Sequence, residues 1–422
     1  MVNPEDRAFL TRLFEAAVAA ADPKQAIAAH LPDRPKGRTV VIGAGKGAAQ
    51  MGAAFEELWG EPVEGVIVTR YGYAAPCKYL QVIEAAHPVP DAAGMTASAA
   101  LFEAVSGLGE DDLVVALICG GGSALLPAPP EGLGLEDEAA LNAALLASGA
   151  PISAMNAVRK QVSRIKGGRL AAAAYPARVV SLIVSDVPGD DPAQVASGPT
   201  VPDAVDRAAA EALIAAYRID LPPAIRSFLD RVPEDAPRPD DPRFARNTVH
   251  VIASAAQSLE AAARVAQAEG SPTVILSDRI EGEAREVGKV HAAIAREVAE
   301  RGRPFAAPVV ILSGGETTVT LTGKGGRGGR NSAFLLSLAC DIEGLSRITA
   351  LAADTDGIDG SEDNAGAFAD GSSAERLRRL GEDPKSLLNA QDSWGAFNAV
   401  QDLFVPGPTG TNVNDFRAIL IK

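Results

Sequence analysis

The sequence predicts an α/β fold in more than one domain, and three observations support that prediction. Short apolar runs alternate along the chain with helical patterns, and glycine-rich or acidic loops join them. This alternation is typical of parallel βα units. The segment at 232–246 is rich in proline and charge but poor in apolar residues, which indicates a domain boundary. At 422 residues the chain is long enough for two cores. We therefore expect one domain over 1–236 and a second over 247–422.

The first domain begins with a helix. Asn3 is placed to cap it, Pro4 stands at its first position, and acidic residues follow in its first turn. We interpret this start as a docked helix and not as a signal peptide. The strands expected after it, each with the loop that follows, lie at 39–47, 65–72, 112–124 and 177–191.

The second domain repeats the theme. Strand-like runs at 248–254 and 273–278 are each followed by an alanine-rich helical pattern. The run at 308–323 is interpreted as two strands around a Gly-Gly turn, and the run at 347–360 as a strand with an acidic loop. The last strand is expected at 416–421. One arrangement we consider has the last stretch, about 30 residues, packing back on a cleft between the domains.

Composition and charge narrow the possible partners. The net charge of −15 argues against nucleic acid, because neutralising phosphates needs a basic face. No run is long and apolar enough to span a bilayer. The three cysteines lie far apart and form no metal-ligand spacing, as in a reducing cytosol. We expect a cytoplasmic monomer or homodimer that binds small molecules.

Two glycine-rich loops follow expected strands. The first, GAGKG, places Gly43, Gly45 and Gly47 around Lys46, and together with Ala48 it fits a dinucleotide-binding fingerprint. Such turns are common, but a lysine at this place favours contact with a phosphate.

The second loop, CGGGSA, contains Gly120, Gly121, Gly122 and Ser123. Three adjacent glycines lose much chain entropy on ordering. A compensating ligand contact is therefore favoured over a flexible turn. The loop is not a G-x-S-x-G nucleophile elbow, because Leu125 takes the final glycine position.

Carboxylates follow two other strands. Asp186 comes directly after a strand, where it could hold Mg²⁺, accept a proton or cap a turn. Asp356 lies in the acidic loop of the second domain, where a Mg²⁺ contact competes with ordinary turn chemistry. His87, of the four histidines, is the one in a loop expected to face a site.

Cations gather in two segments of this acidic chain. The run at 156–170 includes Arg159 and Lys166 on a predicted helix, and it is either a solvated face or a source of cations for a cleft. In the segment at 313–331, Glu316 follows a Gly-Gly turn, and Lys324 and Arg330 lie among glycines before an apolar helix. That combination suits phosphate or carboxylate.

The glycine loops, cations and carboxylates together are what phosphoryl transfer requires, since its catalysis is mostly positioning and charge neutralisation. No Walker A loop, zinc spacing or Ser-His-Asp order can be argued from the sequence. A final glycine-rich loop carries Asn412.

Eight segments resemble one family over nearly the whole chain. They read VIGAGKGAAQM, AAHPVPD, CGGGSALLPAP, NAVRKQVSRIKGGRLA, VSDVPGDDPAQVASGPTVPD, LSGGETTV, GRGGRN and ADTDGIDG. Together they resemble the glycerate 2-kinase family, bacterial and archaeal enzymes with a C-terminal MOFRL domain that were often labelled hydroxypyruvate reductases. The resemblance implies ATP-dependent phosphorylation of D-glycerate at the 2-hydroxyl, giving 2-phosphoglycerate and ADP and needing Mg²⁺. It also implies a Rossmann-like N-terminal domain, a smaller α/β MOFRL-type domain, and a site in the cleft between them.

The resemblance also implies roles for individual residues. The family's essential lysine falls on Lys46, its strand-end aspartate on Asp186, and the arginine of its GRGGRN segment on Arg330. We expect substrate contacts from Arg159, Lys166, Glu316 and Asn412, and a metal contact from Asp356. The expected nucleotide or phosphate contacts come from Gly43, Gly45, Gly47, Gly120, Gly121, Gly122, Ser123 and Lys324.

Two other functions remain open at this point. An NADPH-dependent hydroxypyruvate reductase would use the Gly43-x-Gly45-x-x-Ala48 fingerprint, and Arg70 ends the next strand where a 2′-phosphate would lie. That function gives no role to Lys46 or to the CGGGS and GRGGRN loops. A non-catalytic nucleotide-binding module would explain the glycines but not the placed carboxylates.

Overall fold

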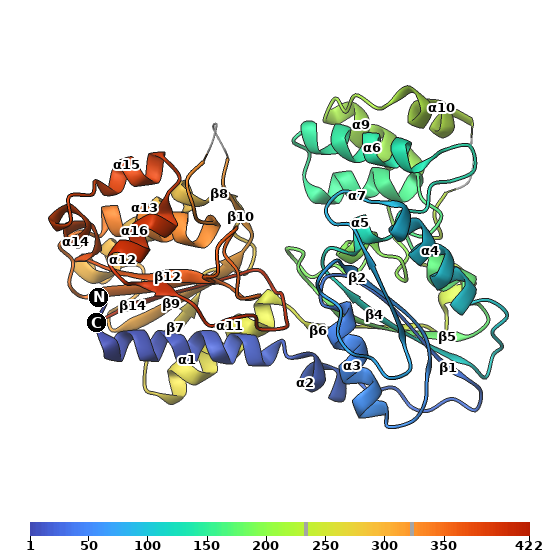
Figure 1. The fold of residues 1–422 in the computed structure, drawn as a ribbon, viewed down its shortest axis with the longest axis horizontal. Coiled ribbons are helices and arrows are strands. Elements are labelled where there is room, and N and C mark those ends of the chain that lie inside the picture. The colour runs from blue at the N-terminus through green and yellow to red at the C-terminus, as the bar shows by residue number, and fades with distance from the viewer. Residues whose placement is uncertain (232–234, 321–324) are drawn as a thin grey trace. The chain divides into compact units, whose positions relative to one another are not determined.

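The computed structural model describes residues 1–231, 235–320 and 325–422, and these form two compact α/β units (Figure 1). One unit consists of residues 23–252 and is called the sheet-1 unit here. The other, the sheet-2 unit, combines residues 1–22 with 253–422. Part of the predicted boundary at 232–246 lies outside the described residues. Among the described helices, none combines the length and apolar character needed to cross a membrane.

The sheet-1 unit is built on six strands in the order β3-β2-β1-β4-β5-β6. The pairs β3–β2, β2–β1, β1–β4 and β4–β5 are parallel. This strand order is typical of the doubly wound, dinucleotide-binding fold. The strands are β1 (Thr39–Ala44), β2 (Glu64–Arg70), β3 (Gln81–Ala85), β4 (Leu113–Cys119), β5 (Arg178–Val184) and β6 (Thr248–Ala253).

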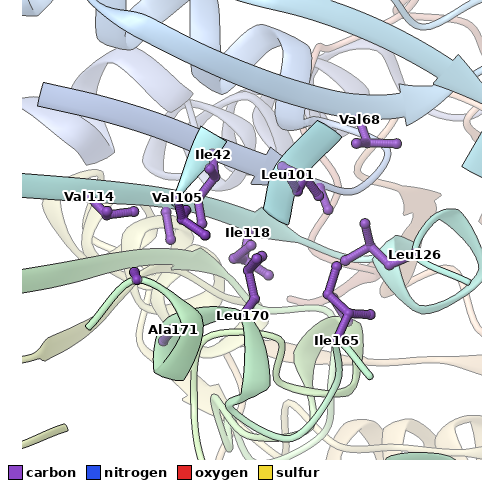
Figure 2. Close-up of a cluster of buried hydrophobic side chains, with 14 of the residues drawn as sticks. Ile42, Val68, Leu101, Val105, Val114, Ile118, Leu126, Ile165, Leu170 and Ala171 are labelled. Carbon is purple, nitrogen blue, oxygen red and sulfur yellow. The ribbon is translucent and has the colours of Figure 1, made fainter. Parts of the chain in front are cut away.

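The predicted strands at 39–47, 65–72, 112–124 and 177–191 are confirmed as β1, β2, β4 and β5. Strand β3 was not predicted, because its edge position leaves its residues half-exposed and gives it no apolar run. Every residue of β4 is buried, because helices cover both faces of a parallel sheet. Figure 2 shows part of the resulting core, where Ile42, Val68 and Ile118 of the sheet meet Leu101 of α4 and Leu170 of α8.

The helices of this unit complete the cover. They are α2 (Pro23–Ala28), α3 (Ala48–Trp59), α4 (Ala92–Ala104), α5 (Gly122–Leu125), α6 (Leu135–Ala147), α7 (Ile152–Gln161), α8 (Arg169–Ala173), α9 (Arg207–Ala216) and α10 (Pro223–Arg231). Two single turns of 3₁₀ helix lie at Val195–Ser197 and Pro242–Phe244. The predicted helix in 156–170 ends at Gln161, so Lys166 lies in the turn before α8.

The sheet-2 unit has a mixed sheet in the order β13-β12-β11-β14-β9-β7. Strand β14 is antiparallel to both β11 and β9, whereas β7 is parallel to β9. The strands are β7 (Thr273–Ile275), β9 (Val309–Gly315), β11 (Ile348–Asp354), β12 (Gly366–Asp370), β13 (Leu403–Phe404) and β14 (Asp415–Ile421). The last strand is therefore central, and the end of the chain belongs to the core of this unit.

The remaining elements pack around this sheet (Figure 1). They are α1 (Pro4–Ala20), α11 (Ala255–Ala268), α12 (Ala284–Arg301), α13 (Arg330–Asp341), α14 (Ser373–Arg379), α15 (Pro384–Asn389) and α16 (Ser393–Ala399). A separate parallel pair joins β8 (Gly282–Glu283) and β10 (Thr317–Thr318). The predicted two strands in 308–323 are thus β9 and β10, but β10 pairs with β8.

Two parts of the chain differ from the predicted domain limits. Helix α1 has the predicted Asn3 cap, but its Leu10, Leu13 and Phe14 lie in the core of the sheet-2 unit. Strand β6 belongs to the first sheet, whereas the sequence assigned 248–254 to the second domain. Both differences have one cause, because helix and strand patterns do not specify which sheet an element joins.

Candidate active site

In the sheet-1 unit, three loops meet at the carboxyl ends of β1, β4 and β5. The Lys46 N–H donates to the Gly120 carbonyl oxygen at 2.8 Å, which ties the first loop to the second. The Gly45 N–H donates to the Val68 carbonyl oxygen at 3.1 Å. Ligands of open α/β sheets bind at this edge, where the strand order reverses between β1 and β4.

Each glycine of the CGGGSA loop is explained by a close neighbour. A Cβ on Gly120 would lie 1.9 Å from Asp186 Oδ2. Gly121 has φ +80°, and a Cβ there would lie 2.9 Å from Lys46 Cγ and 3.3 Å from His87 Nε2. A Cβ on Gly122 would lie 2.6 Å from the Ala196 Cβ. The three glycines therefore let Lys46, His87 and Asp186 gather around one loop.

The GAGKG loop is held mainly by the sheet. A Cβ on Gly43 would lie 2.5 Å from Ile67 Cδ1, and one on Gly45, at φ +137°, would lie 2.4 Å from the Cys119 carbonyl oxygen. At Gly47 the nearest atom, Cys119 Sγ, is 3.7 Å away. Packing thus accounts for two of these three glycines, and their contact with phosphate stays a prediction.

Two titratable side chains beside this loop are held neutral. Burial lowers the pKa of His87 to about 4, and the positive charges of Lys46 and Arg70 act in the same direction. Burial raises the pKa of the Cys119 thiol to about 12, although the Gly47 N–H bonds its sulfur. His87 is therefore a neutral imidazole and Cys119 a neutral thiol near pH 7.

A polar network extends from Ser123. Its Oγ lies 2.6 Å from Ser197 Oγ, which donates to Asn156 Oδ1 at 3.2 Å. Arg159 donates to that same Asn156 oxygen from Nη1 at 2.9 Å, and to Asn142 Oδ1 from Nε at 2.8 Å. The network connects two predicted site residues, Ser123 and Arg159, through Asn156 and Ser197, which the sequence did not single out.

The backbone beside this network is strained. Ala196, Ser197 and Gly198 all have positive φ, at 52°, 60° and 59°. Residues other than glycine rarely adopt positive φ, and backbone strain of this kind clusters at functional sites. The strained turn brings the Ser197 hydroxyl to Ser123, and a sequence of common residues gives no sign of it.

The structure argues against Lys166 as a substrate contact. Its side chain is 2% exposed, and its Nζ donates to Glu138 Oε1 at 2.6 Å and to the Leu126 carbonyl oxygen at 3.1 Å. Buried cations require such a partner. Glu138 lies 28 residues earlier in the chain, so no local pattern indicates the pair. Lys166 holds the interior of the sheet-1 unit together.

In the sheet-2 unit, Arg330 at the start of α13 is surrounded by carboxylates. Its Nε lies 2.6 Å from Asp415 Oδ1, its Nη2 2.7 Å from Asp354 Oδ2 and its Nη1 3.1 Å from Glu316 Oε1. Burial alone would lower the pKa of Arg330, but the carboxylates, Asp415 foremost, raise it overall. Because β14 runs antiparallel to β9 and β11, its first residue lies at the edge where those strands end.

The negative charge here exceeds what Arg330 neutralises. Burial raises the pKa of Asp354 well above its usual range, against the effect of Arg330, and the charges of Asp356 and Asp415 raise it further. Asp356 lies beside it, since the Asp356 N–H donates to Asp354 Oδ1 at 3.2 Å. The described residues contain no group of three or more metal-binding side chains, and the metal contact of Asp356 stays a prediction.

Buried Arg417 was missed by the sequence analysis. It forms an ion pair with Asp415, and its Nη1 donates to the Gly314 carbonyl oxygen at 3.3 Å. Arg417 is the one charged residue of the apolar run FRAILI, and a charge within a strand that is expected to be buried was the available signal.

The GRGGRN loop is shaped by protein contacts. Asp359 accepts the N–H groups of Asn331 at 2.9 Å and Ser332 at 2.8 Å, so it caps α13. A Cβ on Gly329 would lie 2.3 Å from Asp359 Oδ1. In the loop before β14, Asn412 Oδ1 accepts the Asn414 N–H at 3.0 Å. Lys324 lies outside the described residues.

Comparisons with known proteins agree with this architecture. Residues 9–230 match the family described as Domain of unknown function (DUF4147), and residues 309–415 match the MOFRL family. The Glycerate 2-kinase of Pyrococcus horikoshii is 40% identical to this chain, over 100% of the chain and 98% of that protein. This chain belongs to the glycerate 2-kinase family.

Two further family members show the breadth of the likeness. The crystal structure of Glycerate kinase from Thermotoga maritima matches with a TM-score of 0.89 at 35% identity, over 99% of this chain and 100% of that one. A protein of Agrobacterium vitis with the provisional name hydroxypyruvate reductase is 54% identical, over 98% of this chain and 94% of its own length. In the chain described here, the segment that matches DUF4147 includes part of α1, and α1 packs in the sheet-2 unit.

Proposed function

We propose that this protein is a glycerate 2-kinase that transfers a phosphoryl group from ATP to the 2-hydroxyl of D-glycerate, releasing 2-phosphoglycerate and ADP. One observation carries the proposal. A lysine and an aspartate from different strand ends, Lys46 and Asp186, lie against adjacent glycines of one loop. Phosphoryl transfer needs this combination of a cation and a carboxylate held rigidly at a sheet edge. Two relatives that match this chain over 98% and 100% of their own length are named Glycerate 2-kinase and D-glycerate 2-kinase, and they support the proposal.

In the proposed reaction, Asp186 accepts the proton of the 2-hydroxyl. The hydroxyl oxygen forms the new bond to the γ-phosphorus, and the bond from that phosphorus to the oxygen of ADP breaks. Lys46 neutralises the charge on the transferred group, and charge stabilisation of this kind contributes most to the rate of phosphoryl transfer. The glycine loops keep both side chains close to the backbone at this edge of the sheet.

We assign the other predicted residues to binding. The N–H groups of the two glycine loops, Ser123, Lys324 and Arg330 hold phosphate oxygens, and Arg159, Glu316 and Asn412 contact glycerate. Arg330 has carboxylates on all three nitrogens, so binding a phosphate requires it to exchange a partner. Glu316 is the partner most easily released, because its side chain is 49% exposed whereas that of Asp415 is fully buried.

We propose that Mg²⁺ binds at the carboxylates of the sheet-2 unit. Asp356 is the proposed ligand. Burial is the main cause of the raised pKa of its neighbour Asp354, and the charges of Asp356 and Asp415 add to it. Oxygen ligands of this kind are what Mg²⁺ prefers, and an ion held there would neutralise phosphate charge. We also propose a cytoplasmic monomer or homodimer, in keeping with the free cysteines and the net negative charge.

An NADPH-dependent hydroxypyruvate reductase is the second candidate. The strand order of the first sheet and the provisional name of the Agrobacterium vitis relative favour it. Such an enzyme would bind the pyrophosphate at the GAGKG loop. It would leave Lys46, Asp186 and the three glycines between them without a chemical task.

One pair of assays decides between the two activities. The purified protein is incubated with D-glycerate, ATP and Mg²⁺, and ADP and 2-phosphoglycerate are measured. A parallel sample with hydroxypyruvate and NADPH is followed by NADPH absorbance. We expect stoichiometric ADP and 2-phosphoglycerate and no NADPH oxidation. NADPH turnover without 2-phosphoglycerate would overturn the proposal.

A further inference from the structure

A basic residue lies at the end, or just beyond the end, of each of three neighbouring strands of the first sheet. Lys46 lies two residues beyond β1, Arg70 is the last residue of β2, and His87 lies two residues beyond β3. Strands β1, β2 and β3 are paired in parallel in that order. The carboxyl ends of parallel strands meet at the same edge, so these residues form a row beside the proposed reaction centre.

The Lys46 and His87 side chains of this row lie close together, and Arg70 acts on His87 through its charge. Lys46 Cε and His87 Nε2 lie 3.2 and 3.3 Å from one point, the Cβ position of Gly121. The charged groups that act on His87 are Lys46, from the loop after β1, and Arg70, from β2, and both lower its pKa. The Arg70 guanidinium lies over the Tyr73 ring, 4.3 Å from its centroid, which orients it without cancelling its charge.

Such a row favours an anion as its ligand. Burial and the two positive charges keep the imidazole neutral. A carboxylate or phosphate in their midst would pair with the lysine and the arginine by charge-assisted hydrogen bonds. It would also accept a hydrogen bond from the histidine ring.

We infer that Arg70, His87 and Lys46 form one anion-binding subsite, which takes a carboxylate or phosphate group of a substrate next to the transferred phosphoryl group. The inference rests on the proposed function for the identity of the substrates. The anion is either the carboxylate of glycerate, which is attached to the carbon that bears the reacting hydroxyl, or a phosphate of the nucleotide. Arg70 and His87 then bind substrate, and Lys46 serves both the subsite and the transfer.

Steady-state kinetics distinguish the two sources. We compare Arg70→Ala, Arg70→Lys, His87→Leu and His87→Asn with wild type. Arg38→Ala is the matched control, because Arg38 precedes β1 at the opposite edge of the same sheet and is exposed. We expect Arg70→Ala and His87→Leu to raise KM about 10- to 100-fold, as for loss of a charged hydrogen bond, with a smaller change in kcat. A raised KM for glycerate identifies its carboxylate, and a raised KM for ATP identifies a nucleotide phosphate.

The conservative variants separate binding from structure. Asn at 87 keeps a hydrogen-bond donor and Lys at 70 keeps the charge, so each should recover part of the lost affinity. Arg38→Ala should behave as wild type. A twofold change in KM is smaller than the loss of a single hydrogen bond would cause. If Arg70→Ala and His87→Leu leave the KM of both substrates within about twofold of wild type, the subsite does not exist.

A second measurement does not depend on turnover. The chain has four histidines, and the imidazole signals of the ¹⁵N-labelled protein can be titrated by NMR and assigned with His87→Asn. Inorganic phosphate should raise the pKa of His87, because an anion stabilises the imidazolium. In Arg70→Ala the pKa of His87 should rise without phosphate, and the response to phosphate should weaken.

The two measurements separate the inference from the proposed function. A His87 signal that responds to phosphate in a protein without kinase activity would refute the proposed function and retain the anion subsite. A His87 pKa that phosphate does not change, in an active kinase, would refute the subsite and retain the proposed function.

Discussion

The Asp186 carboxylate lies against Gly120, so closely that a methyl group on Gly120 would come within 1.9 Å of Asp186 Oδ2. This contact brings the loop after β5 against the loop after β4. The next residue, Gly121, does the same for Lys46. Two adjacent residues without side chains thus leave room for the proposed base and the proposed cation at one loop.

Replacing Gly120 tests this arrangement. In Gly120→Ala the new Cβ must displace the Asp186 carboxylate, and displacement of a catalytic group by about 1 Å costs about 10²-fold in rate. We expect kcat to fall by that order, measured as 2-phosphoglycerate formation by the purified variant. Gly109→Ala is the control, because its nearest atom would be 3.8 Å away. Equal activity of both variants would contradict the assigned role of Gly120.

Asp186→Asn keeps the shape of the side chain and removes its charge. If Asp186 accepts the hydroxyl proton, kcat should fall about 10²-fold or more. The thermal unfolding midpoint should change little, because Asp186 lies at a half-exposed loop. A variant that turns over near the wild-type rate would show that Asp186 is a turn residue.

Lys46→Met keeps most of the side-chain length and removes the ammonium. Loss of one preorganised charge partner in the transition state costs about 2.7–4 kcal/mol, or about 10²- to 10³-fold in kcat. Lys46→Arg should not restore the rate, because Lys46 Cγ and Cε pass 2.9 and 3.2 Å from the Cβ position of Gly121. A planar guanidinium does not fit the path of a compact ammonium. Full kinase activity in either variant would exclude this role.

The buried pair of Lys166 and Glu138 should matter for stability and not for substrate. Lys166→Met leaves the Glu138 charge buried without its partner, which costs about 3–5 kcal/mol. We expect urea unfolding to show that loss and the folded fraction to keep its KM for glycerate. The double variant Lys166→Met/Glu138→Leu should recover much of the stability. A raised KM with unchanged stability would instead return Lys166 to the substrate site.

The buried His291 should make stability fall with acid. Burial lowers its pKa to about 4, below the value near 6.5 of an unfolded chain. The unfolded state therefore binds the proton first, and stability falls as pH decreases from about 6.5 toward 4, by about 3 kcal/mol at most. His291→Gln should flatten the plot of unfolding free energy against pH over this window. An unchanged slope in urea titrations would contradict the assignment.

Local physical chemistry explains what could be predicted. The strands β1, β2, β4 and β5 are short apolar runs followed by glycine or aspartate, and both signals lie within a few residues of each other. The Asn3 cap was predicted on the same basis, because a cap bonds N–H groups two and three residues on. The strand ends then identified Lys46 and Asp186 as candidates, since loops at one sheet edge converge.

Long-range pairing explains what was not predicted. Glu138 meets Lys166 across 28 residues and Ser197 meets Ser123 across 74, and neither pair has a local pattern. The glycines of the CGGGSA loop were predicted to contact phosphate. The structure shows that other side chains of the protein already approach all three of them.

The sequence by itself determined the α/β class, the main strands, the two glycine loops with Lys46, and the strand-end Asp186. These follow from backbone sterics and hydrophobic periodicity, which act over a few residues. Only the tertiary structure decided that α1 packs in the sheet-2 unit, that Lys166 is a buried partner of Glu138, and that Arg70 and His87 join Lys46 in one row. Burial and charge pairing depend on which segments meet in space, and that is decided when strands and helices compete for a common core.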